Sequence, residues 1–131
     1  MLGAAVGGHL DILKFMLSQG GIFDLQTCVN QAALYGYMDI VKFFLNLEYN
    51  YDYDVIMDRA AEGGHMDIVK LMIQKGATIF DWALIVAASK GYIDIVKLMI
   101  QKGATAFKRA LNGAEKGGHQ EIIELLKQKS R

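Results

Sequence analysis

Apolar residues recur along the chain with the spacing of an α-helix. In one such segment the apolar positions are Ile68, Val69, Leu71, Met72 and Ile73. This apolar arc is wider than one helix face, so the helix has to be covered on two sides. We therefore predict that it lies between a partner helix of its own and a neighbouring copy of the same unit.

One short phrase marks five copies of this helix. It reads glycine, then histidine or tyrosine, one further residue, an acidic residue and two aliphatic residues. Its copies begin at Gly8, Gly36, Gly64, Gly91 and Gly118, in steps of 28, 28, 27 and 27 residues. A fixed period of this size is typical of repeat proteins. We therefore predict one domain, 1–131, whose repeats have the approximate bounds 1–20, 21–48, 49–76, 77–103 and 104–131.

A second, shorter apolar segment precedes each copy of the phrase and ends in small residues. These residues are Ala4-Ala5, Ala32-Ala33, Ala60-Ala61, Ala87-Ala88 and Ala114-Glu115. Alanine loses no side-chain entropy in a helix, and its small size lets a neighbouring helix come close. Each unit is therefore expected to be a small-residue helix, a glycine turn and a larger helix. The predicted fold class is an all-α solenoid of five stacked helix-turn-helix repeats with short connecting loops.

Residue types predict where the larger helix begins and ends. The acidic residue of the phrase, such as Asp67, falls in the first turn, where a negative charge favours the exposed amides and the positive end of the helix dipole. Gly20, Gly76 and Gly103 stand where the helix stops, and glycine supplies the left-handed residue that ends a helix there. Glu48 takes this place in the second repeat, so a different exit is expected there.

The repeated unit resembles the ankyrin repeat. The shared features are the paired alanines, the Gly-His turn, the acidic-Ile-Val-Lys helix and the Gly-Ala ending, as in Ala60-Ala61, Gly64-His65, Asp67-Ile68-Val69-Lys70 and Gly76-Ala77. The resemblance spans all 131 residues. It implies antiparallel helix pairs stacked side by side into a curved solenoid, and a function in protein recognition.

Two features depart from the ankyrin pattern. Ankyrin units have about 33 residues, so the units here are shorter, and the missing residues fall where the family builds hairpin fingers. We expect these fingers to be short or absent, which counts against recognition through finger tips. In place of the family's Thr-Pro-Leu-His stand Thr27-Cys28-Val29-Asn30, Val55-Ile56-Met57-Asp58, Trp82-Ala83-Leu84-Ile85 and Arg109-Ala110-Leu111-Asn112.

Composition narrows the function classes. Lys plus Arg and Asp plus Glu both number 14, so no overall charge attracts nucleic acid or an anionic membrane. The 53% hydrophobic content is enough for a packed core. The longest aliphatic run, 83–88, is too short to cross a bilayer, and the chain starts without a signal-peptide pattern. Because the single Cys28 cannot form an internal disulfide, we expect a soluble, intracellular protein of the cytoplasm.

No set of residues predicts catalysis, a metal site or a cofactor. His9, His65 and His119 occupy the same turn position in different repeats, so they cannot converge on one ion. Paired glycines such as Gly63-Gly64 lack the strand and the motif of a phosphate loop. Cys28 has no histidine in its own repeat to act as a base. We therefore expect structural roles for these residues and no enzymatic activity.

One lysine per repeat forms a ladder along the larger helices. Lys14, Lys42, Lys70 and Lys97 each follow an Asp by three residues, which places the two charges side by side on the helix surface. We therefore expect the ladder to be largely neutralised and not to bind nucleic acid, whose binding would weaken steeply with salt.

The resemblance implies that the first helices and the loops before them form the concave side. The positions after the alanine pair, among them Tyr35, Glu62, Lys90 and Lys116, differ from copy to copy, whereas the second helix barely changes. This contrast is expected if a partner reads one face and the other face only packs. The predicted function is to bind a protein partner through the concave helix and loop surface.

The least repetitive segment, 48–54, alternates tyrosines with acidic or amide residues. Tyrosine and tryptophan are favoured at interface hot spots. We therefore hypothesise an aromatic and acidic patch that suits a basic or mixed partner segment, formed by Tyr35, Tyr51, Tyr53, Asp54, Glu62, Asp81 and Trp82. The alternative is that the tyrosines fill the space left by the missing finger.

The two ends of the array differ. In the last repeat Lys127 replaces the aliphatic Ile73 and Ile100, a polar change typical of a terminal repeat. Leu10 and Leu13 of the first repeat show no such change, so we expect either self-association through this uncapped repeat or a start inside a longer array. A targeting or substrate-recruiting domain of a larger enzyme or adaptor therefore stays open as an alternative function.

Overall fold

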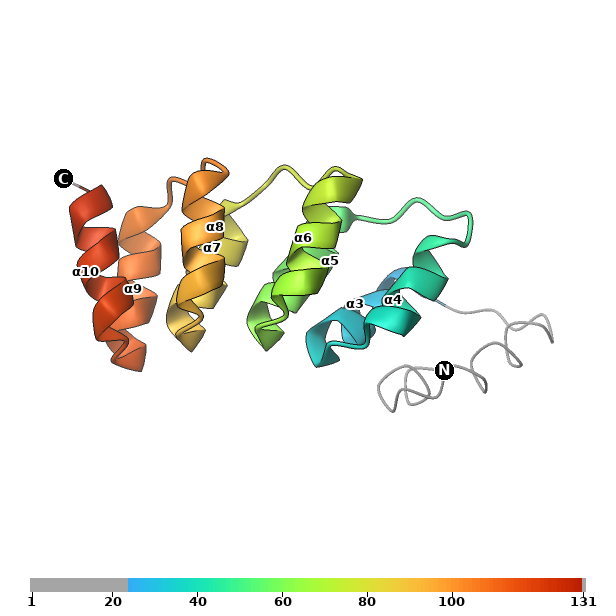
Figure 1. Cartoon of the computed structure of the whole chain (residues 1–131), viewed down its shortest axis with the longest axis horizontal. Helices are drawn as coiled ribbons and strands as arrows, with labels where there is room; N and C mark the ends of the chain where they lie inside the picture. The colour runs from blue at the N-terminus through green and yellow to red at the C-terminus, as the bar shows by residue number, and fades with distance from the viewer. Residues whose placement is uncertain (1–23, 131) are drawn as a thin grey trace.

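The computed structural model describes residues 24–130, which form a row of α-helices without a strand (Figure 1). The helices are α3 (Leu25–Tyr35), α4 (Met38–Leu45), α5 (Tyr53–Gly63), α6 (Met66–Lys75), α7 (Asp81–Lys90), α8 (Ile93–Gln101), α9 (Phe107–Gly117) and α10 (Gln120–Lys129). Loops 46–52, 76–80 and 102–106 join four helix pairs. The all-α solenoid and the absence of hairpin fingers are confirmed within these residues. The predicted first repeat, 1–20, lies outside them.

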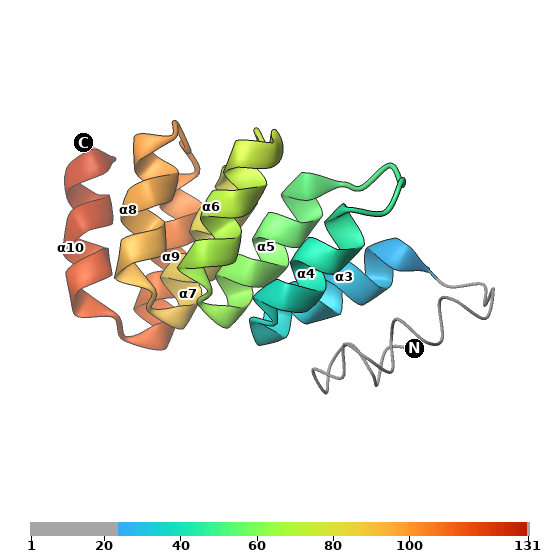
Figure 2. The same cartoon turned by 45° about the vertical axis from the view of Figure 1, so that its right-hand side comes forward.

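The helix pairs stack into two layers (Figure 2). The first helices, α3, α5, α7 and α9, form one layer, and the second helices, α4, α6, α8 and α10, form the other. Each second helix packs on the first helix of its own pair, and neighbouring first helices pack directly on one another. Contacts between neighbouring second helices are fewer. The stack is therefore tighter along the first-helix layer.

Residue size explains the difference between the two layers. The paired alanines of the first helices, such as Ala60 and Ala61, are fully buried and let the helix backbones approach closely. The second helices bury larger side chains, among them Phe44, Ile68 and Met72, which hold their backbones farther apart. A row that is closer on one side bends toward that side. The first helices therefore line the concave face.

The turn inside each helix pair depends on glycine. Gly36 has a φ of 80°, a left-handed conformation that other residues rarely adopt. The ring of His65, from the next repeat, also lies against this glycine, and a Cβ on Gly36 would lie 2.6 Å from its Cε1 atom. Gly91 meets His119 in the same way. The turn glycine therefore both ends the first helix and receives the ring of the following repeat.

The second helices end in two different ways. Gly76 and Gly103 follow α6 and α8 with positive φ. After Gly76, the N–H of Ala77 donates to the Met72 carbonyl at 3.0 Å. α4 has no such glycine, and no residue of the loop 46–52 that follows it has a positive φ. The predicted glycine ends at Gly76 and Gly103 and the predicted different exit of the second repeat are confirmed, whereas Gly20 lies outside the described residues.

Candidate partner-binding surface

The carboxylates of Asp54 and Asp81 hold the loop of the next repeat. Asp54 lies in the first turn of α5, and its Oδ1 accepts hydrogen bonds from the N–H groups of Thr78 (2.9 Å) and Ile79 (3.0 Å). Asp81 of α7 accepts the same two bonds from loop residues 105–106, at 2.7 and 3.2 Å. Two of the three acids of the predicted patch, Asp54 and Asp81, therefore join repeats to one another.

Tyr51 belongs to the core. Its side chain is 6% exposed, and its hydroxyl donates to the Phe44 carbonyl at 2.6 Å. Phe44 corresponds in the repeat to Met72, whose carbonyl receives the N–H of Ala77 from the Gly-Ala ending. At the end of α4 the Phe44 carbonyl instead receives the Tyr51 hydroxyl together with the N–H of Leu47, at 2.9 Å. Burial, with a smaller contribution from Tyr49 and Tyr53, raises the pKa of Tyr51 to about 12, which keeps the donor proton in place. Tyr51 is therefore a packing residue, and its buried side chain is not part of an exposed patch.

Trp82 presents an aromatic surface on the concave layer. It lies in the first turn of α7 and is 48% exposed. The Cζ atom of Arg109 lies 5.9 Å from the ring centroid, within the range of a cation–π interaction. Arg109 occupies the same repeat position as Trp82, one unit later. Arg109 was not predicted as part of the patch, although its repeat position, equal to that of Trp82, was a signal that could have indicated it.

The other predicted residues come from successive first helices. Lys90 and Lys116 are exposed near the ends of α7 and α9, and Tyr35 is 51% exposed at the end of α3. Glu62 of α5 is half-buried, and Tyr53 packs partly against the core. Within the described part of the chain, no hydrogen bond, ion pair or ring contact joins any two of these five residues. They share a layer without forming one cluster.

Asp58 of α5 is an unusual group that sequence patterns did not indicate. Its Oδ1 atom is buried and has no hydrogen-bond partner among the described residues. Burial is the main cause that raises the pKa of Asp58 to about 7, and the negative charges of Asp54 and Asp52 add to it, while Arg59 opposes them. Near neutral pH this carboxyl is therefore divided between its neutral and charged forms.

His65 and His119 have the structural role expected of the turn histidines, and His9 lies outside the described residues. Nε2 of His65 lies 3.0 Å from the carbonyl oxygen of Leu34, and Nε2 of His119 lies 3.0 Å from that of Ser89, one repeat earlier in each case. A Cβ on Gly63 would lie 2.1 Å from the same Leu34 oxygen. The paired glycines therefore make room for the histidine contact, and Gly63 is fixed by packing.

The described residues contain neither a cluster of metal ligands nor an activated thiol. Between residues 24 and 130, no three His, Cys, Asp or Glu side chains gather as a metal ion would require. No helix in that range is long and apolar enough to span a membrane. Cys28 is buried, and burial raises the pKa of its thiol. The thiol is therefore held in its neutral, less reactive form.

In the described part of the lysine ladder, Lys42, Lys70 and Lys97 form no ion pair, and Lys14 lies outside the described residues. Oδ1 of Asp39 and Oδ1 of Asp67 accept from the N–H of the residue that follows each, at 2.9 and 2.8 Å. Across the described residues, the one ion pair is that between Arg59 and Glu62, at 3.6 Å. The predicted Asp–Lys pairing is wrong for the described repeats, because an Asp in the first turn, such as Asp39 or Asp67, lies beside the free helix amides and binds them instead.

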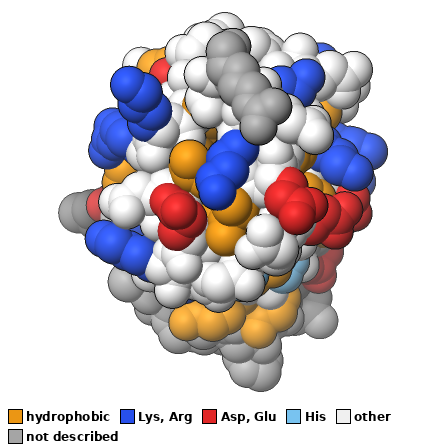
Figure 3. All heavy atoms as spheres, turned by 90° about the vertical axis from the view of Figure 1, so that its left-hand side faces the viewer, with side chains coloured by type: hydrophobic (Ala, Val, Ile, Leu, Met, Phe, Trp, Pro, Cys, Tyr) orange, Lys and Arg blue, Asp and Glu red, His pale blue; other side chains and the backbone are white. Residues whose placement is uncertain are grey.

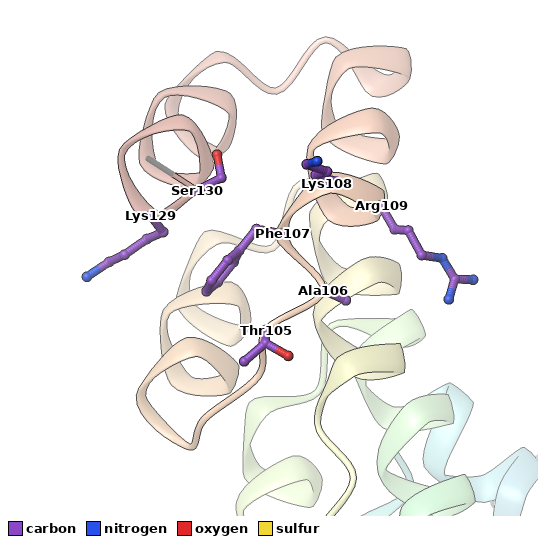
Figure 4. A pocket seen from close by; sticks show the side chains of 7 residues that line it. All are labelled: Thr105, Ala106, Phe107, Lys108, Arg109, Lys129 and Ser130. Atoms are coloured by element: carbon purple, nitrogen blue, oxygen red, sulfur yellow. The ribbon is translucent and has the colours of Figure 1, made fainter.

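A hollow of about 360 Å³ opens beside Phe107 at the α9–α10 end of the array (Figure 4). Arg109 and Lys129, two of the residues that line it, point away from each other. Figure 3 views this end, where charged side chains surround small hydrophobic areas. The predicted polar residue Lys127 is exposed. Because the charged groups diverge, the hollow does not have the converging contacts of a small-molecule site.

Comparison with known families agrees with this geometry. A family profile described as "Ankyrin repeats (3 copies)" matches residues 1–81, 30–110 and 57–131, which together cover the chain. A search of curated proteins found no match to the sequence. The resemblance rested on the paired alanines, the Gly-His turn, the acidic-Ile-Val-Lys helix and the Gly-Ala ending, and the family profile agrees with it. The chain belongs to the ankyrin-repeat family.

Proposed function

We propose that the chain binds a partner protein on its concave layer, at a surface centred on Trp82, and does no chemistry of its own. Ankyrin repeats are generally protein–protein interaction modules and are typically not enzymes. The 48% exposure of Trp82 on a first helix carries the proposal. Tryptophan and arginine are enriched at interface hot spots, and Arg109 lies beside this ring.

The charges of the first helices indicate the kind of partner. α5 carries three acidic residues and one arginine, α7 carries one charge of each sign, and α9 carries three basic residues and one acidic residue. The charge of the first-helix layer thus changes from negative at α5 to positive at α9, and Trp82 of α7 lies between them. A partner segment that is basic toward α5 and acidic toward α9 complements this surface.

A quantitative pull-down from the native cell tests the proposal. The baits are the wild-type chain, Trp82→Ala and, as a control at an exposed position of the outer layer, Gln128→Ala. We expect Trp82→Ala to reduce affinity for the partner by about 30-fold, since loss of a hot-spot side chain costs about 2 kcal/mol. Circular dichroism checks that each variant is folded. Recovery of the same proteins in equal amounts by all three baits would contradict the proposal.

A further inference from the structure

The outer layer carries the same hollow between two different pairs of neighbouring helices. The hollow between α4 and α6, of about 220 Å³, is lined by Lys42, Leu45, Asn46, Leu71 and Lys75. The hollow between α8 and α10, of about 290 Å³, is lined by Lys97, Ile100, Gln101, Leu125 and Lys129. Counted by the repeat period, each residue of the first hollow corresponds to one residue of the second. The hollow is therefore a feature of the repeat itself.

Each hollow has an aliphatic floor and a lysine on either side. Leu45 and Leu71 are partly buried, so an apolar group placed between them would leave water and gain free energy. Lys42 and Lys75 are exposed at the two rims. The sequence places the same residue types between α6 and α8, namely Lys70, Ile73, Gln74, Leu98 and Lys102.

The lysines of the outer layer are free to meet an outside charge. The one ion pair of the described residues lies on α5, in the other layer. Asp39 and Asp67 sit at the turn end of their helices and bind helix amides, whereas lysines such as Lys75 and Lys102 continue to the loop end. Glu124 takes the ladder position on α10 and is the exception. The loop-end half of the outer layer is therefore basic, with apolar hollows between the lysines.

We infer that this half of the outer layer binds an acidic protein segment in a polyproline II conformation, with one apolar side chain in each hollow. Neighbouring helices lie about 10 Å apart, and a polyproline II segment advances about 3.1 Å per residue with about three residues per turn. Apolar residues three positions apart therefore lie on one face of the segment at about the helix spacing, and the acidic residues between them flank the lysines. This surface is on the layer opposite to Trp82, so it is a second interface, independent of the proposed function.

Two labelled peptides test the pattern by fluorescence anisotropy with the intact chain. The first peptide, of about twelve residues, has leucine at every third position and glutamate elsewhere. The control peptide has the same composition with its leucines in adjacent pairs. We expect saturable binding of the first peptide and at least about fivefold weaker binding of the control, because the control cannot fill successive hollows. Equal binding of the two peptides would overturn the inference.

Two charge-reversed variants locate the binding. Lys75→Glu with Lys97→Glu changes one rim lysine of each hollow, and the matched control, Lys90→Glu with Lys116→Glu, makes the same charge change on the first helices. We expect the first variant to lose about tenfold in affinity for the patterned peptide, and the control to change by less than about twofold. Equal losses in the two variants would mean unspecific charge attraction and would overturn the inference. Tighter binding to DNA or to phosphatidylserine vesicles than to the patterned peptide would also overturn it.

Discussion

The third and fourth repeats have the same second helix and different first helices. Residues 67–78 and 94–105 are identical in sequence, and α6 and α8 bury the same side chains. In the first helices, by contrast, Asp58 of α5 corresponds to Ile85 of α7. α6 and α8 each pack on the first helix of their own pair and lie between neighbouring second helices, so the same residues suit both positions. The first helices are identical only at the paired alanines, which pack, and at Asp54 and Asp81, which bind the loop of the next repeat.

This difference gives the two layers different kinds of surface. The second helices repeat their exposed positions along with their buried ones, so the outer layer presents the same hollow more than once. The first helices present features that occur once, such as Trp82 where α5 has Val55. A periodic surface suits a periodic partner segment, whereas a unique surface suits a single binding site.

The largest expected effect comes from the position before the turn glycine, which is Gly63 in the third repeat and Lys90 in the fourth. We expect Gly63→Ala to lower the free energy of unfolding by about 3 kcal/mol, because its Cβ would overlap the Leu34 carbonyl and the His65 ring. Lys90→Ala should change it by less than about 0.5 kcal/mol. Urea unfolding measures both. If the two variants changed the free energy of unfolding equally, the view that packing requires glycine at residue 63 and leaves residue 90 unconstrained would be contradicted.

The loops that enter the two repeats differ in the same way, since Tyr51 precedes α5 and nothing like it precedes α7. We expect Tyr51→Phe to cost about 1.5 kcal/mol, because the buried Phe44 carbonyl loses its hydroxyl donor. Tyr49, which is 47% exposed, provides the control, and Tyr49→Phe should be nearly neutral. If Tyr51→Phe had the same free energy of unfolding as the wild-type chain, the hydroxyl would not be needed to stabilise the end of α4.

The smallest effect depends on pH and comes from Asp58, where α7 has Ile85. Its pKa of about 7 in the folded chain lies above the ordinary value of 3.8, so folding favours the protonated form. Stability is therefore lost as the pH rises from about 4 to about 7, and the loss is complete above that range. At pH 8 we expect Asp58→Asn to stabilise the chain by about 1 kcal/mol, a value kept small because solvent screens part of the penalty.

Thermal unfolding at pH 5 and pH 8 checks this effect. The gain in Tm from Asp58→Asn should be larger at pH 8 than at pH 5. Glu115→Gln, at an exposed acid of α9, serves as the control and should show no such difference. A gain from Asp58→Asn that is the same at both pH values would rule out a titrating Asp58.

The repeat architecture could be predicted because its signals act over a few residues. The paired alanines, the turn glycines and the glycine ends each set the local backbone or the approach of an adjacent helix. Even the irregular exit at Glu48 follows from the absence of one glycine. These features need no knowledge of which side chains meet across repeats.

The surface was harder to predict because it depends on contacts between repeats. The sequence around Asp54 indicates only an acidic side chain in the first turn of a helix. In the structure its carboxylate accepts hydrogen bonds from the N–H groups 24 and 25 residues later. Tyr51 lies in a run of alternating polar and aromatic residues that suggests exposure, yet the end of α4 leaves a carbonyl that its hydroxyl reaches. The raised pKa of Asp58 depends on burial, which no local pattern specifies.

Site-specific photo-crosslinking tests the concave layer as the binding face most directly. A benzoylphenylalanine replaces either Lys90 of α7 or Lys70 of α6, two exposed lysines on opposite layers. The protein to follow is the one that wild-type chain retains and Trp82→Ala loses. We predict that this protein is crosslinked from residue 90 and not from residue 70. Crosslinking from residue 70 alone would contradict a concave binding site.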